Sequence, residues 1–422
     1  MTIFKTNPSY RSWFTADMSG EIARQIVFSS MTLLAYSVTH DVKQTGFIAA
    51  LMALTRFISM LAASWVVDFY PKRRLMVINA LCRIVLSASV VVLLITGHMG
   101  FISLIAVAIG YGAIGGIFGN LTNAILPFIV DELELKDALS LNETRDSIIQ
   151  IAAAPLSVFL FSMLRALPFI VDIMGFAIVA IGARYIHGVI DAEHSNELSP
   201  GITHTLQEFW ERSTAGMRWV AHHHGIRAIL ALMTLNGLSS FLVINTVELN
   251  ILDSDQPVWH VGAVFACFSA GMVCGGIISG PLRKAFSNHQ IIIITSTIST
   301  ITMACLSIMD HWMIVGTLLA VWTLPVIANN AVLGASQMIA TPSKLQGRVG
   351  AAFGLIIGLT PILGASSAGL LLDNLGWQFT IMLATGIGIG GLTIAIFSQA
   401  LRGIINEQNS PQRSSGGRAS KS

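Results

Sequence analysis

Charge is the property this sequence has least of, and its scarcity excludes an ordinary soluble protein. Only 11% of the 422 residues are Asp, Glu, Lys or Arg, whereas a soluble domain carries about a quarter. Apolar residues make up 54% of the chain. Most of the surface must therefore face something other than water. The net charge of +2 and the lack of a basic patch with interleaved aromatic residues give no indication of nucleic-acid binding.

Cysteine is scarce as well, and we expect no cofactor and no metal site. The four cysteines lie in apolar stretches without the spacing of metal ligands, so they are interpreted as small buried residues: Cys82, Cys267, Cys274 and Cys305. The sequence also lacks a nucleophile elbow, paired catalytic carboxylates and a phosphate-binding loop. We therefore expect neither an enzyme nor an ATP-driven pump.

Two further absences narrow the class of protein. Residues 1–12 are polar and contain no cleavable signal peptide, so the first apolar segment is expected to serve for targeting. No part of the chain alternates strictly between polar and apolar residues, as the strands of a membrane barrel do. The remaining way across a bilayer is the α-helix.

Long apolar runs are what the sequence does have. A helix needs about 20 apolar residues to cross a bilayer core of about 30 Å, and runs of this length recur throughout the chain. We expect an all-α membrane protein with twelve transmembrane helices in two six-helix bundles. The expected spans are 14–38, 45–67, 75–96, 101–125, 142–164, 168–187, 226–249, 261–281, 290–308, 313–335, 350–372 and 378–400.

The distribution of basic residues predicts cytoplasmic N- and C-termini, since lysine and arginine favour cytoplasmic loops. With this orientation the opposite loops hold only Lys43 and Arg165. The cytoplasmic side includes Lys5, Arg11, Lys72, Arg73, Arg74, Lys136, Arg283, Lys284, Lys344, Arg348 and Arg402. We expect a multi-pass protein of the cell (inner) membrane.

A polar stretch divides the chain into two halves of similar length. We expect an N-terminal bundle at 1–187, a cytoplasmic linker at 188–225 with a surface helix near 205–220, a C-terminal bundle at 226–401 and a disordered tail at 402–422. The halves are weakly similar, which indicates an internal duplication. Two bundles that rock about a central cavity are suited to alternating access.

Several motifs resemble the major facilitator superfamily over nearly the whole chain. The segment from Asp68 to Arg74 occupies the place of that family's loop motif after the second helix, with the Asp and the basic cluster kept and the glycines replaced. The branch of enterobactin exporters and macrolide efflux proteins is the most similar. Its resemblance rests on Gly216-Met217-Arg218-Trp219, Leu345-Gln346-Gly347-Arg348-Val349, and Asn123 to Pro127 followed by Asp137-Ala138-Leu139 and Asn142.

The resemblance implies a secondary active transporter that exports a small amphiphilic molecule, such as a drug, macrolide or siderophore, and acts as a monomer surrounded by lipid. Whether transport is coupled to proton antiport is left undecided by two departures from the pattern of drug/proton antiporters in this superfamily. Residues 154–159 lack the glycines that those antiporters often carry, and the fourth helix lacks the arginine that many of them have there. The alternatives are an importer or lipid transporter of the same fold, or a non-transporting receptor or scaffold.

Charged residues inside the predicted spans gather in the N-terminal half. These residues are Asp17, Glu21, Arg24, Arg56 and Arg83. Each costs about 2.5–3.5 kcal/mol to insert even on a lenient scale, so they should be paired or face water. In the C-terminal half, Glu248 is predicted near the outer end of a span.

We interpret the charged residues of the first half as a coupling network. Glu21, with Asp17, is the candidate protonatable site, and Arg56 is its candidate partner, since a change of partner would move a proton on and off. The alternative is a static ion pair among Glu21, Arg24 and Arg56 that fixes helix packing. Asp172 and the cluster of Glu143, Arg145 and Asp146 are ambiguous.

Two other groups of residues have candidate roles. Asp68 could latch one conformation of the transporter. The basic residues that follow could face lipid headgroups or could simply set the orientation in the membrane: Lys72, Arg73 and Arg74. Six residues could line a substrate cavity, although amides in spans often only join helices: Asn120, Asn123, Asn236, Phe241, Asn329 and Asn330.

Overall fold

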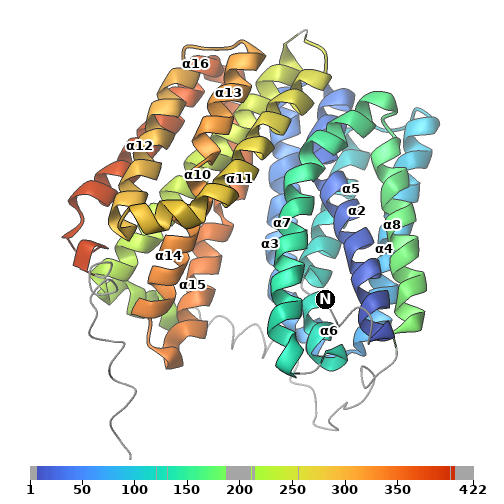
Figure 1. The fold of residues 1–422 in the computed structure, drawn as a ribbon. Coiled ribbons are helices and arrows are strands. Elements are labelled where there is room, and N and C mark those ends of the chain that lie inside the picture. The colour runs from blue at the N-terminus through green and yellow to red at the C-terminus, as the bar shows by residue number, and fades with distance from the viewer. Residues whose placement is uncertain are drawn as a thin grey trace, which may run out of the picture.

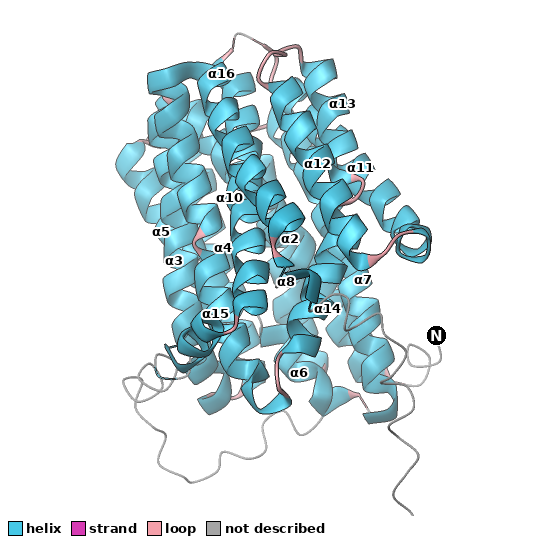
Figure 2. Ribbon diagram, turned by 90° about the vertical axis from the view of Figure 1, so that its left-hand side faces the viewer, coloured by secondary structure: helices cyan, strands magenta, loops and turns pink. Residues whose placement is uncertain are grey.

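The computed structural model describes residues 7–119, 121–130, 132–186, 211, 214–254, 256–399 and 401–403. The side chains of a few residues within these ranges, among them Asp68 and Asn123, lie outside the described part. Within the described ranges the chain is helical and contains no strand, as Figure 2 shows. The expected all-α class is confirmed.

The helices form two groups that stand side by side in Figure 1. The first group contains α2 (Pro8–Thr39), α3 (Val42–Phe69), α4 (Lys72–Ile95), α5 (Phe101–Phe118), α6 (Leu121–Ile129), α7 (Glu132–Met163) and α8 (Leu167–Tyr185). The second contains α10 (His224–Asp253), α11 (Trp259–Ala285), α12 (Asn288–Leu306), α13 (Trp312–Thr323), α14 (Val326–Ala340), α15 (Gln346–Gly358) and α16 (Thr360–Phe397), with a short 3₁₀ turn at Ser343–Leu345.

The two ends of these helices can be told apart without reference to a membrane. We call the end where α8 ends and α10 begins the linker end, and the end where α2 gives way to α3 the far end. Helix α2 begins at the linker end and α16 finishes there (Figure 1). Most of the predicted linker, 187–210, and the tail from 404 onward lie outside the described residues, whereas 214–222 is helical.

Side-chain caps explain several helix boundaries. The side chain of Asn7 accepts a hydrogen bond of 2.9 Å from the backbone N–H of Tyr10, and Asp41 does the same for Gln44 at the start of α3. Each cap satisfies an N–H that has no partner within its helix. Polar residues at these turns therefore fix where the long apolar helices begin.

Three predicted spans are not single regular helices. The segment 101–125 is divided between α5 and α6 near Gly119, and 313–335 between α13 and α14 at Leu324–Pro325. Pro325 has no N–H to continue a helix. The segment 350–372 is divided between α15 and α16 at Leu359. Helix α16 itself holds Gly376 at φ 77°, a conformation that favours glycine, and this break lies between the expected spans 350–372 and 378–400.

Ten segments of the described chain are long and apolar enough to cross a membrane. Helix α2 is not among them, and its Asp17, Glu21 and Arg24 make it less apolar. The stretch Gln346–Phe397 counts as one segment although Gly376 interrupts it. A multi-pass membrane protein is confirmed, and the number of twelve crossings stays a prediction.

Glycines spaced by four residues allow helices to pack backbone to backbone in both groups. A Cβ on Gly116 of α5 would lie 2.4 Å from the carbonyl oxygen of Arg56 on α3. A Cβ on Gly275 of α11 would lie 2.4 Å from that of Leu324, which follows α13. Gly112 and Gly271, one turn earlier, make equally close approaches. Such spacing is typical of membrane helix pairs.

The two groups meet from the middle of the molecule to the far end. A Cβ on Gly369 of α16 would lie 2.5 Å from the carbonyl oxygen of Val42 on α3. Near this crossing, Lys43 and Asp373 form an ion pair of 2.5 Å. Farther along, Ser269 of α11 donates a hydrogen bond of 2.6 Å to the carbonyl of Ile151 on α7.

Candidate functional site

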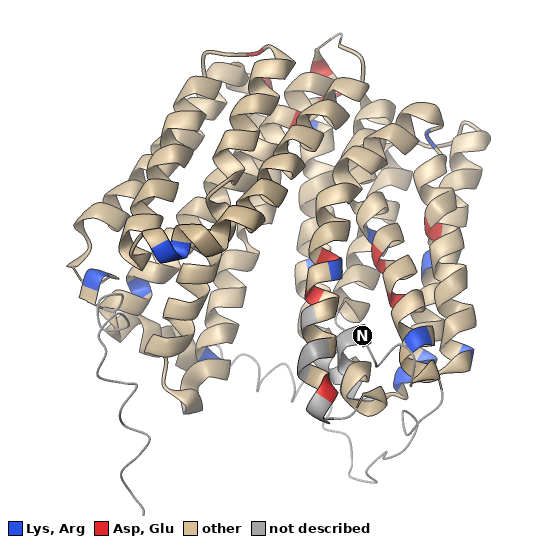
Figure 3. Cartoon of the chain, viewed as in Figure 1, with Lys and Arg blue, Asp and Glu red and all other residues tan. Residues whose placement is uncertain are grey.

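Figure 3 shows charged residues along the middle of helices in the first group, whereas in the second group they lie mainly near the helix ends. In the first group several of these side chains are buried, among them Asp17, Arg83 and Asp172. One such network lies on α2. Arg24 donates to both carboxylate oxygens of Glu21, at 2.6 and 2.9 Å, and Gln25 donates to Glu21 at 2.9 Å. These residues lie one turn apart, so a single helix brings them together.

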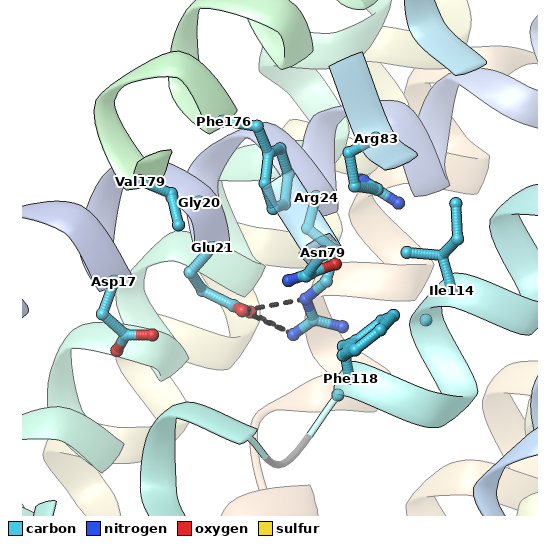
Figure 4. Close-up of a pocket in the computed structure, with 12 residues that line it drawn as sticks. Asp17, Gly20, Glu21, Arg24, Asn79, Arg83, Ile114, Phe118, Phe176 and Val179 are labelled. Atoms are coloured by element: carbon cyan, nitrogen blue, oxygen red, sulfur yellow. Dashed lines mark hydrogen bonds and ion pairs between the residues drawn. The ribbon is translucent and has the colours of Figure 1, made fainter. Parts of the chain in front are cut away.

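A small cavity of about 50 Å³ opens beside this pair. Figure 4 shows Asp17, Glu21 and Arg24 around it, together with Asn79 of α4 and Arg83. The predicted charged residues of α2 therefore do share one face and one water-sized space. A carboxylate beside such a space can exchange protons with solvent, which a fully packed carboxylate cannot.

Asp17 has a partner that lies far away in the sequence. Its carboxylate accepts a hydrogen bond from Arg145 of α7, and the same guanidinium donates to Asp146 at 2.7 Å. The ring of Phe14 lies 4.8 Å from the guanidinium carbon. Arg145 is buried, so this member of the ambiguous cluster at the start of the fifth predicted span belongs to the helix interface, whereas Glu143 is exposed.

Arg83 forms a separate network with α8. It donates to Asp172 at 2.9 Å, and Ser87 donates to the other carboxylate oxygen at 2.5 Å. The hydroxyls of Ser87 and Tyr111 are 2.7 Å apart. This network closes off Asp172, which is fully buried.

Arg56 does not pair with Glu21 in this conformation. Its guanidinium lies 5.9 Å from the ring centre of Phe28, and among the described residues no carboxylate forms an ion pair with it. Arg56, Arg24 and Arg83 all line a narrow space of about 20 Å³. Three arginines thus face the same interior region, and only two of them have a carboxylate.

The basic motif after α3 joins helices within the first group. Arg73 donates hydrogen bonds of 3.0 Å to the carbonyls of Ala183 and Arg184 at the end of α8. Lys72 lies 4.7 Å from the ring centre of Phe128, and Arg74 is exposed. Arg73 therefore satisfies helix-end carbonyls instead of facing headgroups. The predicted latch residue Asp68 has its side chain outside the described part.

A much larger cavity, of about 500 Å³, lies within the second group. Its wall carries three of the predicted substrate residues, Asn236, Asn329 and Asn330, and contains no charged side chain among the described residues. Of the other predicted residues, Phe241 lines a neighbouring cavity, and the side chains of Asn120 and Asn123 are outside the described part. We call the larger space the neutral cavity. Its polar lining includes Ser239, Ser240, Thr295, Ser296, Ser299, Thr300 and Thr323.

Two buried oxygens of the neutral cavity have no hydrogen-bond partner in the described structure. They are Oδ1 of Asn329 and Oγ of Ser296, on side chains that are 4% and 3% exposed. Trp322 donates to Ser299 at 3.0 Å on the same wall. An unpaired buried polar group costs about 1–3 kcal/mol, so these atoms suit a ligand that can hydrogen-bond to them.

A third cavity, of about 170 Å³, lies between the two groups and contains a residue to which the sequence analysis assigned no role. Glu248 of α10 faces Thr32 of α2 there, among Phe28, Phe241 and Phe265. We call it the central cavity. A carboxylate near the outer end of a span was visible in the sequence, but the helices that enclose it come from both halves.

No group of three or more potential metal ligands occurs among the described residues.

Comparisons with known proteins agree on one fold. The family model described as Major Facilitator Superfamily matches residues 16–355. No curated protein sequence matches the chain significantly. Among solved structures, a bacterial homolog of the human lysosomal transporter Spinster, inward-facing and unoccupied, has a TM-score of 0.67 at 10% identity, covering 96% of this chain and 98% of that one.

The nucleoside transporter NupG is also similar. Its TM-score is 0.63 at 11% identity, with 91% of this chain and 98% of that one covered. A mutant form of the same transporter gives 0.64 at 12% identity, with coverages of 91% and 99%. At these identities the likeness shows the fold alone.

Proposed function

Because the chain belongs to the Major Facilitator Superfamily, we propose that it is a secondary active transporter that moves a small amphiphilic molecule out of the cell by alternating access. That the protein is a membrane transporter of this superfamily rests on the family match and the fold. Export, cargo and coupling are the parts proposed here, together with twelve crossings, cytoplasmic termini, an inner-membrane location and a monomeric state.

The observation that carries the proposal is that interior charges and the largest described cavity lie in different halves of the molecule. Interior ion pairs occur in the first group, at Glu21–Arg24, Asp17–Arg145 and Arg83–Asp172. The neutral cavity, lined by amides, hydroxyls, methionines and aromatic rings, lies in the second. A transporter needs both a chargeable element to couple to a gradient and a surface that accepts cargo. Adaptable Met-rich surfaces suit cargo of variable shape.

The pattern of contacts between the groups supports an inward-facing conformation. Close approaches such as Gly369 to Val42 lie toward the far end, and the basic residues of the sequence gather toward the linker end. If that end is cytoplasmic, the far-end contacts close the exit in this state. Export would then require them to separate while the linker end closes.

We propose that Glu21 is the proton-coupling group, with Asp17 assisting. Glu21 borders a water-sized cavity, and Arg56 stands nearby without a carboxylate among the described residues. A shift of Glu21 from Arg24 toward Arg56 would change its proton affinity. A static Glu21–Arg24 pair is the competing explanation.

Transport into and out of vesicles tests direction and coupling together. Everted membrane vesicles from cells that express the protein should accumulate an amphiphilic dye when a proton gradient, acid inside, is imposed. Right-side-out vesicles with the cellular polarity of the gradient, acid outside, should not accumulate it. Uptake by right-side-out vesicles under that gradient would make the protein an importer.

A pair of matched variants tests the coupling residue. Glu21→Gln should retain dye binding but lose gradient-driven accumulation, whereas Glu143→Gln, an exposed carboxylate on α7, should behave as the wild type. Normal rate and pH response in Glu21→Gln would remove the coupling role.

A further inference from the structure

Glu248 occupies an unusual position for a carboxylate. It lines the central cavity with residues from both groups, among them Thr32 of α2 and Ala154 of α7. The other described residues of that wall are mainly apolar or aromatic. The carboxylate is therefore placed where the two halves face one another, and not within either half.

The cavity provides no counter-ion for this carboxylate. No lysine, arginine or histidine lines it among the described residues, and Glu248 takes part in none of the five described ion pairs. The carboxylates deep in the first group are different, because Asp17, Glu21 and Asp172 each have an arginine. An uncompensated charge in such a place is costly, which favours a bound proton or a cation from outside the chain.

The aromatic lining indicates which kind of cation fits. Phe28, Phe241 and Phe265 border the same space as the carboxylate. Ring faces attract organic cations and add to the attraction of a carboxylate. A bare metal ion would need several oxygen ligands at fixed distances, and Glu248 is the one carboxylate among the described residues that line this cavity.

We propose that Glu248 recognises the cationic group of an amphiphilic organic cargo, such as a substituted amine or quaternary ammonium. This inference rests on the proposed transport function and names its substrate class. The carboxylate supplies the charge, and the phenylalanine rings exclude water and hold the alkyl groups around the cationic nitrogen.

The remainder of such a cargo has an adjoining place to bind. The central and neutral cavities share Ile244 in their walls. Along α10, Asn236, Ser240, Ile244 and Glu248 follow one another every four residues and so lie on roughly one face. At 1.5 Å per residue, Ser240 is about 12 Å from Glu248 along the helix axis. A cargo with a cationic end and hydrogen-bonding groups about 12 Å away would fill both cavities.

Binding of two isosteric probes tests the charge recognition directly. Benzyltrimethylammonium carries a cationic nitrogen, and neopentylbenzene has a neutral carbon in its place. Equilibrium dialysis with the purified full chain in detergent micelles, corrected with protein-free micelles, gives the affinity of each. The wild type should prefer the cation by about tenfold or more, and Glu248→Gln should abolish that preference without weakening the neutral probe.

Controls make the outcomes distinct. Asp253→Asn changes a carboxylate on the same helix that bonds Tyr36 outside the cavity, and it should bind as the wild type does. Glu248→Asp should keep part of the preference. The proposal is overturned if Glu248→Gln keeps the preference, if it loses both probes equally, or if the wild type does not distinguish them. If the wild type binds the cation but does not transport it across the vesicle membrane, the binding site at Glu248 is supported and the proposed transport function is wrong.

Discussion

The guanidinium of Arg83 on α4 donates a hydrogen bond of 2.9 Å to the carboxylate of Asp172 on α8, and both side chains are almost completely buried. The ring centres of Tyr111 and Phe176 each lie 4.8 Å from the guanidinium carbon. The hydroxyl of Ser87 donates a hydrogen bond to the second carboxylate oxygen of Asp172. Arg83 borders the small cavity beside Glu21, but Asp172 is fully buried and both of its carboxylate oxygens accept hydrogen bonds, so it has little room to exchange partners. We infer that the pair ties α4 to α8, whereas Glu21 beside its cavity is free to respond to a proton.

Removing one member of this pair should therefore destabilise the protein more than removing a half-exposed carboxylate such as Asp146. Asp172→Asn leaves a buried arginine without its countercharge, which costs about 3–5 kcal/mol. Thermal unfolding of the purified protein in detergent should show a clearly lowered midpoint, and Asp146→Asn, which removes the half-exposed second partner of Arg145, should change it little. An Arg83→Met/Asp172→Leu double variant should recover much of the loss. Equal midpoints for Asp172→Asn and Asp146→Asn would contradict the structural role.

Much of the helical pattern follows from the sequence because apolar run length determines it. Helix α3 was expected at 45–67 and occupies Val42–Phe69, and α10 was expected at 226–249 and occupies His224–Asp253. The Asp41 cap accounts for the added residues at the start of α3, whereas α10 begins without a side-chain cap. The breaks at Gly119, Pro325 and Leu359 were not predicted, since an apolar run looks continuous whether or not the backbone bends.

The partners of the interior charges could not be predicted in the same way. Asp17 and Arg145 are 128 positions apart, and only the packing of α2 on α7 brings them together. The sequence shows that a charge inside a span needs a partner, but not which one. Glu248 was judged by its distance from a helix end, whereas its environment comes from helices of both halves.

The ion pair between Lys43 and Asp373 should separate during each transport cycle. It lies at the far end beside the Gly369–Val42 crossing, so outward opening must break it. In a variant without the native cysteines, Lys43→Cys/Asp373→Cys should form a disulfide that stops transport, and a reductant should restore it. Lys43→Cys/Asp310→Cys serves as the control pair. Undiminished transport by the fully cross-linked protein would show that this end does not open.

Gly216 should be intolerant of any side chain. Its Cβ would lie 2.1 Å from the carbonyl oxygen of Arg348, so two motifs that the sequence analysis treated separately are in backbone contact. Gly216→Ala must push the 214–222 helix away from α15, and we expect a loss of about 1–3 kcal/mol, as for other overpacked sites. Gly350→Ala meets open space and is the matched control. Both variants are compared by thermal unfolding in detergent, where similar midpoints would mean that the helix can shift freely.

Asn329 should select cargo by hydrogen bonding and not by charge. Its Oδ1 is buried without a partner on the wall of the neutral cavity, so a ligand that donates a hydrogen bond there relieves an existing cost of about 1–3 kcal/mol. Asn329→Leu removes the acceptor at similar volume and should weaken binding of a hydrogen-bonding cargo about tenfold, since tenfold corresponds to 1.4 kcal/mol. It should leave binding of benzyltrimethylammonium unchanged, because that probe has no N–H or O–H to donate. Asn374→Leu, at an exposed amide of α16 that bonds only its own helix, should alter neither. Equal weakening of donor and non-donor ligands would mean that Asn329 only maintains the shape of the cavity.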